Sequence, residues 1–405
     1  MKVLLLTTGS RGDVQPFLAL ARGLTEAGHE ATVAAPRRFA ALSAEVGAEF
    51  VGLDDSLFVL QDELVGAGTW AAITAASRAR PYLQRWLDDL ASLAGTRADV
   101  VVFTQKTLGG ASIAEKLGVP AIPAQLIPTV PATSAFASPL APARTPRALA
   151  RLTWSLADAV ERPWRGMVAR WRAERLGLAS RAPRFASLVA AGGILSAWSP
   201  HLLPAPSDWP ASAAPLGFWT VPAAPDWHGS PALEAFLDDG PPPVLVGFGS
   251  MTHRDPAALA AEVVAGLRRA GRRGLIVSGW AGLGATSAAE DVHVVDAVPF
   301  ASVLPRVAAI VHHGGVGTVA AAMRAGVPQV VHPFFGDQPF WARRLHELGV
   351  APPTLSSLTA DGLAASLAQV DALVPAARRI RAALAGEDGV AAARARIEAA
   401  VGGHG

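Results

Sequence analysis

Apolar and polar positions along the first third of the chain indicate short buried strands that alternate with amphipathic helices. Residues 3–7 form a continuous apolar run, as in a parallel strand that is covered on both faces. A glycine-rich turn over residues 9–13 follows, and a helical spacing of apolar residues then ends at Gly28, a residue type that often follows a helix C-terminus. With a second strand over residues 30–35, the order strand, helix, strand predicts a doubly wound parallel sheet.

The same pattern recurs further along, with a strand predicted over residues 100–103, a helix over 110–117 and a strand edge over 120–123. Residues 124–150 are rich in Pro, Ala, Ser and Thr and have no clear period, so they are predicted as a long loop. The helical stretch after this loop carries three tryptophans, Trp154, Trp164 and Trp171. We expect these tryptophans to pack in a core or an interface; the alternative is the wall of an apolar ligand pocket or a surface that touches lipid.

The second half repeats the α/β pattern after residues 206–230, which are rich in Pro and Trp and are predicted as a linker. Strands are predicted over 243–248, 275–277, 292–295, 308–311 and 329–332, and helices over 256–270, 316–325 and 338–348. We therefore expect two doubly wound Rossmann-like domains, residues 1–205 and 231–388, that face a ligand-binding cleft. Residues 389–405 are predicted as a C-terminal helix that could pack back on the first domain.

Composition narrows the possible classes of function. Of 405 residues, 51% are hydrophobic and 17% are charged, which is typical of a globular protein, and the formal net charge is +2. No run of Lys and Arg suits a nucleic-acid backbone, so no nucleic-acid partner is expected. The absence of Cys excludes disulfides, thiolate metal sites and a cysteine nucleophile. No segment approaches the roughly 18 consecutive apolar residues of a transmembrane helix, and we expect a cytoplasmic location.

Candidate chemistry is concentrated in the second half, where the sequence VHHGGVGT over residues 311–318 joins a predicted strand to a predicted helix. Backbone N–H groups at a helix N-terminus bind phosphate well, and glycines allow the close approach that this binding needs. His313 adds a side-chain donor. The residues of the predicted phosphate site are His313, Gly315, Val316, Gly317 and Thr318. The alternative is a plain turn between strand and helix.

Other polar and aromatic residues follow neighbouring strands. Ser250 would present its hydroxyl group to the same ligand, or it only caps a helix. Trp280 offers a stacking face for a base, or it is a core residue. Val298 could contact a pyrimidine edge only through its backbone. Asp337 and Gln338 suit hydrogen bonds to sugar hydroxyls; the alternative is an N-terminal cap by Asp337.

Two of these segments resemble known motifs. Residues 312–338 resemble the donor-site motif of the family 1 glycosyltransferases with the GT-B fold. The opening sequence TGSRGDVQPF, residues 8–17, resembles the N-terminal signature shared by sterol glucosyltransferases and bacterial antibiotic glycosyltransferases. The resemblance implies pyrophosphate binding by His313, base stacking by Trp280 and sugar contacts by Asp337 and Gln338. It implies the phosphate loop at Gly315, Gly317 and Thr318, the pyrimidine contact at Val298, and positions near the pyrophosphate for Ser10 and Arg11.

The same resemblance implies that Asp13 is the catalytic base. Plant members with small-molecule acceptors have a histidine after the first strand, but this chain has none before His29. An aspartate is a weaker base, so it would accept an alcohol proton late in the transition state. The alternative is that Asp13 caps a helix over residues 15–27; it could also do both.

The expected function is that of an inverting glycosyltransferase, a hexosyltransferase that moves a sugar, glucose first, from a UDP- or TDP-sugar. The expected acceptor is a hydroxyl group of a lipophilic small molecule: a sterol, triterpenoid, macrolide or aromatic polyketide. We expect no metal and no cofactor other than the nucleotide-sugar substrate, and peripheral membrane contact stays open. The alternatives are a nucleotide-sugar epimerase on the same architecture and a non-catalytic nucleotide-sugar-binding protein.

Overall fold

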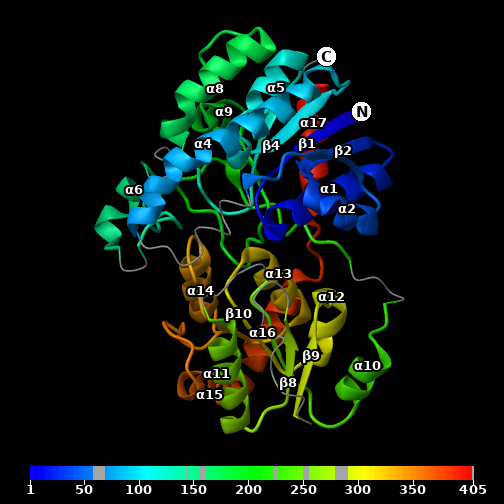
Figure 1. Cartoon of the computed structure of the whole chain (residues 1–405), viewed down its shortest axis with the longest axis vertical. Coiled ribbons are helices and arrows are strands. Elements are labelled where there is room, and N and C mark those ends of the chain that lie inside the picture. Colours follow the sequence, from blue (N-terminus) through cyan, green and yellow to red (C-terminus); the bar gives the residue numbers. More distant parts are fainter. Residues whose placement is uncertain are drawn as a thin grey trace. The chain divides into compact units, whose positions relative to one another are not determined.

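The computed structural model consists of two compact units (Figure 1). Unit 1 comprises Met1–Val221 and Asp388–Gly405, and unit 2 comprises Pro222–Glu387. The structure describes residues 1–57, 69–142, 145–155, 161–222, 227–249, 255–278 and 291–403, and for residues 69–77 it describes only the backbone. None of the helices in these ranges is long and apolar enough to span a membrane.

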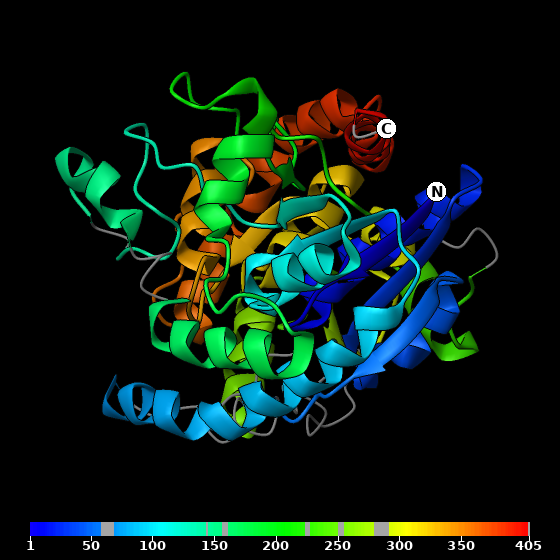
Figure 2. The same ribbon diagram turned by 90° about the horizontal axis from the view of Figure 1, so that it is seen from above.

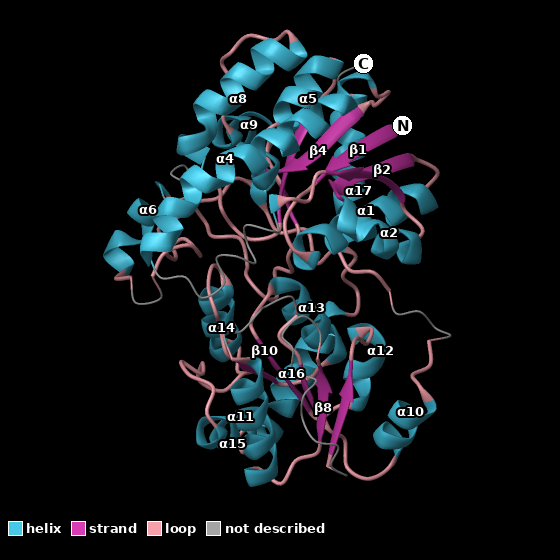
Figure 3. Ribbon diagram, in the orientation of Figure 1, coloured by secondary structure: helices cyan, strands magenta, loops and turns pink. Residues whose placement is uncertain are grey.

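Unit 1 is built on a six-stranded sheet whose strands pair in parallel in the order β3-β2-β1-β4-β5-β6. The strands are β1 (Lys2–Leu6), β2 (Glu30–Pro36), β3 (Glu49–Leu53), β4 (Val100–Thr104), β5 (Ala121–Gln125) and β6 (Leu195–Ser196). The order reverses between β1 and β4, which are hydrogen-bonded neighbours (Figure 3). In doubly wound sheets, ligands bind at the carboxyl ends of the strands that flank this switch point.

The α-helices in the described part of unit 1 are α1 (Arg11–Glu26), α2 (Ala40–Val46), α4 (Thr69–Ala91), α5 (Gly110–Leu117), α6 (Ala150–Thr153), α8 (Arg165–Trp171), α9 (Phe185–Gly192) and α17 (Gly389–Gly402). They cover both faces of the sheet because alternate residues of β1 point to opposite sides. Val3 and Leu5 belong to a core with α1 and α17, whereas Leu4 and Leu6 belong to a core with α4, α5, α8 and α9. Figure 2 shows α4 and α17 on opposite sides of this sheet.

Unit 2 has a five-stranded parallel sheet in the order β11-β10-β7-β8-β9. The strands are β7 (Val244–Val246), β8 (Gly274–Val277), β9 (Val292–Val295), β10 (Ala309–His312) and β11 (Gln329–Val331). The helices are α10 (Pro231–Asp238), α11 (Pro256–Arg269), α12 (Phe300–Val303), α13 (Val316–Ala325), α14 (Gln338–Glu347), α15 (Ala360–Leu367) and α16 (Val370–Leu384). The switch point lies between β7 and β10, and helices cover both faces. The predicted fold class, α/β with doubly wound parallel sheets, is confirmed in both units.

The structure differs from the prediction in the first part of the proposed linker. Trp209, Phe218 and Trp219 are buried within unit 1, and the chain leaves unit 1 only after Val221. Trp209 packs against other aromatic side chains of unit 1. The predicted C-terminal helix, α17, covers another part of this segment. Its Arg396 donates hydrogen bonds to the carbonyl groups of residues 211 and 212, at 2.9 and 2.7 Å, and its apolar side chains share a core with Trp219.

The predicted loop over residues 124–150 is irregular over most of its described length, but side-chain hydrogen bonds and aromatic contacts hold it in unit 1. The Gln125 amide nitrogen donates to the carbonyl of Val130 at 2.8 Å. Asp208 accepts hydrogen bonds from the Thr133 hydroxyl group and the Ser134 amide, at 2.6 and 3.0 Å, and these bonds lower the pKa of its carboxyl group. Trp154 packs under the loop against Phe136.

Candidate active site

At the switch point of unit 1, the turn after β1 places Asp13 in the first turn of α1. Ser10 is the residue before the helix, and its amide and hydroxyl group both donate to Asp13 Oδ2, at 2.8 and 3.1 Å. This is the reciprocal half of a capping box. Gly9 has φ of +119°, and a Cβ atom there would overlap the Asp13 carboxylate, so the turn requires glycine. The helix begins at Arg11 and not near residue 15, which corrects the predicted start.

The other oxygen of Asp13 faces the neighbouring strand. Lys106 follows β4 and its ammonium group lies 2.5 Å from Asp13 Oδ1. The Asp13 side chain is 17% exposed, so this carboxylate combines a charged partner with partial access to solvent. Asp13 therefore caps α1 with one oxygen and presents the other at the ligand-binding edge of the sheet. Of the two neighbours in the predicted site, Ser10 contacts Asp13, whereas Arg11 is exposed and donates to Gln15 at 3.1 Å.

Unit 1 also contains a cavity of about 830 Å³ that starts at the carboxyl end of β4. Its apolar lining includes Phe103, Leu108, Trp164, Val168, Phe185 and Leu188. Its polar lining includes Gln105, whose amide nitrogen donates to Glu161 at 2.7 Å. Of the three tryptophans in the predicted helical stretch, Trp154 and Trp171 are core residues and Trp164 lines this cavity. The alternative for this stretch, the wall of a ligand pocket, therefore holds for Trp164. The sequence did not show the rest of the wall, because three separate segments form it.

At the switch point of unit 2, His313 follows β10 and lies beside Gly249, which follows β7. A Cβ atom at Gly249 would stand 3.3 Å from His313 Cε1, and one at Gly315 would collide with His313 Nε2. His313 Nδ1 is buried and has no hydrogen-bond partner among the described residues. Burial lowers the pKa of His313 to about 4, so the ring is neutral near pH 7 and has one nitrogen that donates and one that accepts.

The first turn of α13 adds backbone donors next to His313. Gly315 precedes the helix and has no side chain that could cap it, and its carbonyl accepts the first helical bond from Val319 at 3.0 Å. The amides of Val316, Gly317 and Thr318 have no partner inside the helix, as in the first turn of any α-helix. The described part of the chain provides no other acceptor for them. Three N–H groups at the positive end of a helix, beside an imidazole, are suited to bind a phosphate group.

The side chains of Asp337 and Gln338 accept hydrogen bonds from residues close to them in the sequence. The Asp337 carboxylate accepts from Trp341 Nε1 at 2.7 Å and does not cap α14, so the capping alternative for Asp337 is wrong. Gln338 is buried, and its side-chain carbonyl accepts from the amides of Phe334 and Phe335, at 2.7 and 3.2 Å. Both residues therefore shape the segment before α14, and their contact with a sugar stays a prediction.

The remaining predicted residues follow β7, β8 and β9. Val298 lies beyond the carboxyl end of β9 and is partly buried against the core below it. Nearby, the Ser278 hydroxyl group donates to Asp296 at 3.0 Å and joins the ends of β8 and β9. Ser250 and Trp280 lie outside the described residues. Within the described ranges, no group of three or more His, Asp or Glu residues could hold a metal ion.

Two family models match the chain, one in each half. Residues 3–136 match the glycosyltransferase family 28 N-terminal domain, and residues 277–393 match the erythromycin biosynthesis protein CIII-like C-terminal domain. These matches contain the Asp13 and His313 segments respectively.

Two curated relatives extend the likeness to most of the chain. O-mycaminosyltylonolide 6-deoxyallosyltransferase of Streptomyces fradiae is 36% identical over 418 residues, which cover 95% of this chain and 94% of that protein. A sterol 3-beta-glucosyltransferase of Arabidopsis thaliana is 32% identical over 373 residues, or 87% of this chain. The chain spans 57% of the length of that plant enzyme.

Solved structures support the fold. The glycotransferase of kitacinnamycin is similar with a TM-score of 0.72 and 21% identity, over 99% of both chains. The glycosyltransferase VinC, solved with dTDP, has a TM-score of 0.64 and 21% identity over the whole of both chains. Both matches show that the chain has the GT-B fold.

Proposed function

The chain belongs to the GT-B glycosyltransferases that include sterol glucosyltransferases and bacterial natural-product glycosyltransferases. We propose that it transfers a hexose from a UDP- or TDP-sugar to a hydroxyl group of a lipophilic small molecule. The observation that carries this proposal is the switch point of unit 2. There the unpartnered nitrogen of His313 lies beside the three free amides of α13, which suits the diphosphate of a nucleotide sugar.

In the proposed reaction, Asp13 accepts the proton of the acceptor hydroxyl group. Oδ1 has two lone pairs, so it can accept this proton's hydrogen bond while it keeps the contact with Lys106. The acceptor oxygen attacks the anomeric carbon as the bond from that carbon to the diphosphate oxygen breaks. Attack opposite the leaving group inverts the configuration. The amides of α13 and His313 stabilise the negative charge that develops on the departing nucleoside diphosphate.

The donor is proposed to be UDP-glucose first and a TDP-sugar second. The sequence PFFGDQ over residues 333–338 resembles that of glucose users, whereas VinC was solved with dTDP. We propose Trp280 and Val298 as contacts of the base, Ser250 as a further contact of the diphosphate, and Asp337 and Gln338 as contacts of the sugar. We also propose that the protein groups carry the leaving-group charge without a metal ion. Activity that survives EDTA would support this last point, and activity lost with EDTA and restored by Mg²⁺ would contradict it.

The lipophilic acceptor is proposed to enter the cavity of unit 1. Its volume of about 830 Å³ lies within the roughly 300–1,000 Å³ of typical small-molecule sites, and its lining combines apolar and aromatic side chains with polar and charged ones. Trp164→Ala should raise the KM for the acceptor and leave nucleotide binding unchanged, because Trp164 lines this cavity of unit 1 and the diphosphate is proposed to bind in unit 2. Leu152→Ala is a matched control, since Leu152 is 70% exposed and is not part of the lining. Equal KM values in both variants would place the acceptor elsewhere.

The direct test is mass spectrometry of the purified protein after incubation with UDP-glucose or TDP-glucose and a panel of sterols, macrolides and phenolic polyketides. Addition of one hexose to an acceptor, with release of nucleoside diphosphate, is the expected result. Asp13→Asn is the control that should bind UDP but transfer little. A sugar that is epimerised without an acceptor would show an epimerase instead. Nucleotide binding without any transfer across the panel would indicate a non-catalytic binding protein.

A further inference from the structure

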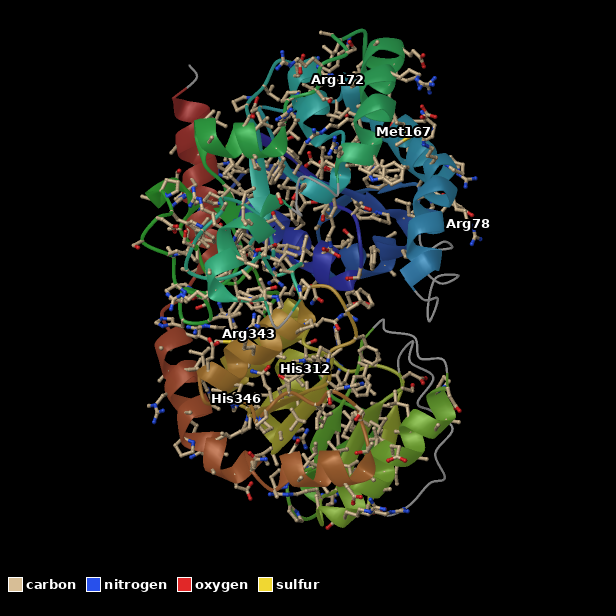
Figure 4. All side chains as sticks on the ribbon, turned by 90° about the vertical axis from the view of Figure 1, so that its left-hand side faces the viewer. Arg78, Met167, Arg172, His312, Arg343 and His346 are labelled. Carbon is tan, nitrogen blue, oxygen red and sulfur yellow. The ribbon has the colours of Figure 1, made fainter. Side chains whose placement is uncertain are left out.

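His312, the residue before His313, is one of the most completely buried polar residues in unit 2. It is the last residue of β10, its exposed fraction is 0%, and it lies in the interior of the unit (Figure 4). Two hydrogen bonds use both of its ring nitrogens. Nδ1 pairs with the amide of Gly314 at 3.1 Å, and Nε2 pairs with Gln329 Oε1 at 3.0 Å. The proposed reaction gives this residue no role, although it adjoins the predicted phosphate site.

These two bonds determine the tautomer of the ring. A backbone amide can only donate, so Nδ1 of His312 must accept the bond from Gly314. In a neutral ring the proton is then on Nε2, which donates to the carbonyl oxygen of the Gln329 side chain. If the Gln329 amide had the opposite orientation, its NH₂ group would donate to His312 Nε2. The ring proton would then be on Nδ1, where it would clash with the N–H group of Gly314. The N–H group of Gly314 therefore determines both the tautomer of His312 and the orientation of the Gln329 side-chain amide.

The register of the sheet explains why Gln329 is within reach. His312 pairs with Val331 and Ile310 pairs with Gln329 in the parallel ladder of β10 and β11. Because alternate residues of a strand share a face, His312 and Gln329 lie diagonally on the same face of the sheet. The His312 ring is thus fixed to the neighbouring strand at one nitrogen. The other nitrogen remains available to orient the turn that leaves β10.

Gly314 is the residue that this contact orients. It has φ of +92°, and a Cβ atom there would stand 3.0 Å from Val331 Cγ1 and 3.1 Å from the carbonyl oxygen of Gln338. The turn is therefore packed closely on one side, and its amide is directed back to His312 on the other. His313 precedes Gly314 and Gly315 follows it, so the orientation of this peptide sets the positions of both the imidazole and the start of α13.

We propose that His312 is a positioning residue for the diphosphate site: by accepting the Gly314 amide at Nδ1, it holds the turn over residues 313–315 in the conformation that binds the nucleoside diphosphate. This inference rests on the proposed function, because it assigns His312 to the diphosphate-binding turn of the same site. The low pKa of His312, about 3 because of burial and of the neighbouring His313, is consistent with this role. A protonated ring would carry hydrogens on both nitrogens and could not accept the Gly314 bond.

Two substitutions separate the nitrogens of the ring. In His312→Asn the side-chain carbonyl oxygen takes a position close to that of Nδ1 and can still accept from Gly314, but the contact with Gln329 is lost. In His312→Gln the amide group is one bond longer, so it can reach Gln329 but places no acceptor at Gly314. His312→Leu removes both bonds at similar volume. The Asn and Gln variants are therefore a matched pair that differs in which bond is kept.

The experiment measures UDP and TDP binding by calorimetry, together with donor KM and kcat where transfer is detected, in the full chain. We expect His312→Gln and His312→Leu to weaken nucleotide binding about 3- to 10-fold, the worth of one oriented hydrogen bond, and His312→Asn to retain most of the affinity. A purely structural role would instead lower the affinity and the unfolding midpoint of the Asn and Gln variants in parallel.

Three outcomes would overturn the inference. The first is wild-type affinity in His312→Gln and His312→Leu, and the second is an affinity in His312→Asn as low as in His312→Leu. In either case the proposed function would still hold if the wild-type protein binds UDP or TDP and His313→Ala clearly weakens that binding. The third is a wild-type chain that binds neither UDP nor TDP, which would contradict the proposed function as well.

Discussion

Unit 2 should lose stability when the pH falls from 7 to 5, because one neutral histidine ends β10 and a second one follows it. Burial lowers the pKa of His312 to about 3, with a smaller contribution from the neighbouring His313, and burial lowers that of His313 to about 4. An unfolded histidine titrates near ~6.5. The unfolded chain therefore binds protons that the folded unit does not bind. The stability that the two neutral histidines contribute is fully present above about pH 6.5. It is lost as the pH falls towards their pKa values in the folded unit.

The size of this loss follows from the linkage relation. At pH 5 an unfolded histidine is almost fully protonated, and each of the two residues should cost unit 2 about 2 kcal/mol relative to pH 7. Together the two histidines account for about 4 kcal/mol, a large part of the stability of an ordinary domain. The lowered pKa of His293, also caused by burial, acts in the same direction.

The assay is a urea titration at pH 7 and at pH 5, with a short pulse of deuterium labelling at one fixed pH to read the unfolded fraction. Peptides from β10 and α13 report unit 2, and peptides from β1 and β4 of unit 1 serve as the internal reference. His312→Asn is the control, because it lacks one of the two titrating rings. Its loss between pH 7 and pH 5 should be smaller than that of the wild type by about 2 kcal/mol. Equal losses in the variant and the wild type would refute the reasoning.

Three further predictions concern single side chains. Asp13→Asn should lower kcat roughly 10²–10⁴-fold without a change in UDP affinity, measured by steady-state kinetics and calorimetry; an unchanged kcat would leave Asp13 only its role at the start of α1. His313→Ala should weaken UDP binding about 10-fold by calorimetry, and wild-type affinity would show that the turn does not bind the diphosphate. Arg172→Met should destabilise unit 1 by about 2–3 kcal/mol in urea, because the buried guanidinium group bonds both oxygens of Glu115 at 2.9 Å. Arg175→Met is its control: that side chain is 54% exposed, so removal of its ion pair should cost under about 1 kcal/mol.

The parts of the fold that the sequence predicted well are those that local signals determine. The helices over 110–117 and 316–325 have the predicted bounds, since Gly118 and Gly326 end them with φ of +70° and +72°. The first helix begins four residues before the predicted start, because Ser10 and Asp13 together form its cap. That cap is also a local signal, and the spacing of Ser10 and Asp13 could have revealed it.

Contacts between distant segments explain what the sequence did not predict. The Pro- and Trp-rich composition after residue 205 suggested a linker, but the partner that buries part of it, α17, comes about 180 residues later. Lys106 was not recognised as a partner of Asp13, because 93 residues separate them and only the pairing of β1 with β4 brings them together. By contrast, His313 and the start of α13 are continuous in sequence, so their proximity was predictable.

The two units use the same topological position for different chemistry. In each sheet the switch point lies between the first and the fourth strand along the chain, β1 and β4 in unit 1 and β7 and β10 in unit 2. In unit 1 this position presents a carboxylate, a group that can accept a proton. In unit 2 it presents a neutral imidazole and free amides, which suit an anion. A carboxylate at the start of α13 would repel the diphosphate that is proposed to bind there. The start of α1 without the Asp13 carboxylate could not accept the proton of the acceptor hydroxyl group in the proposed reaction. Substitutions at the two positions should therefore act on separate quantities: kcat for Asp13 and nucleotide affinity for His312 and His313.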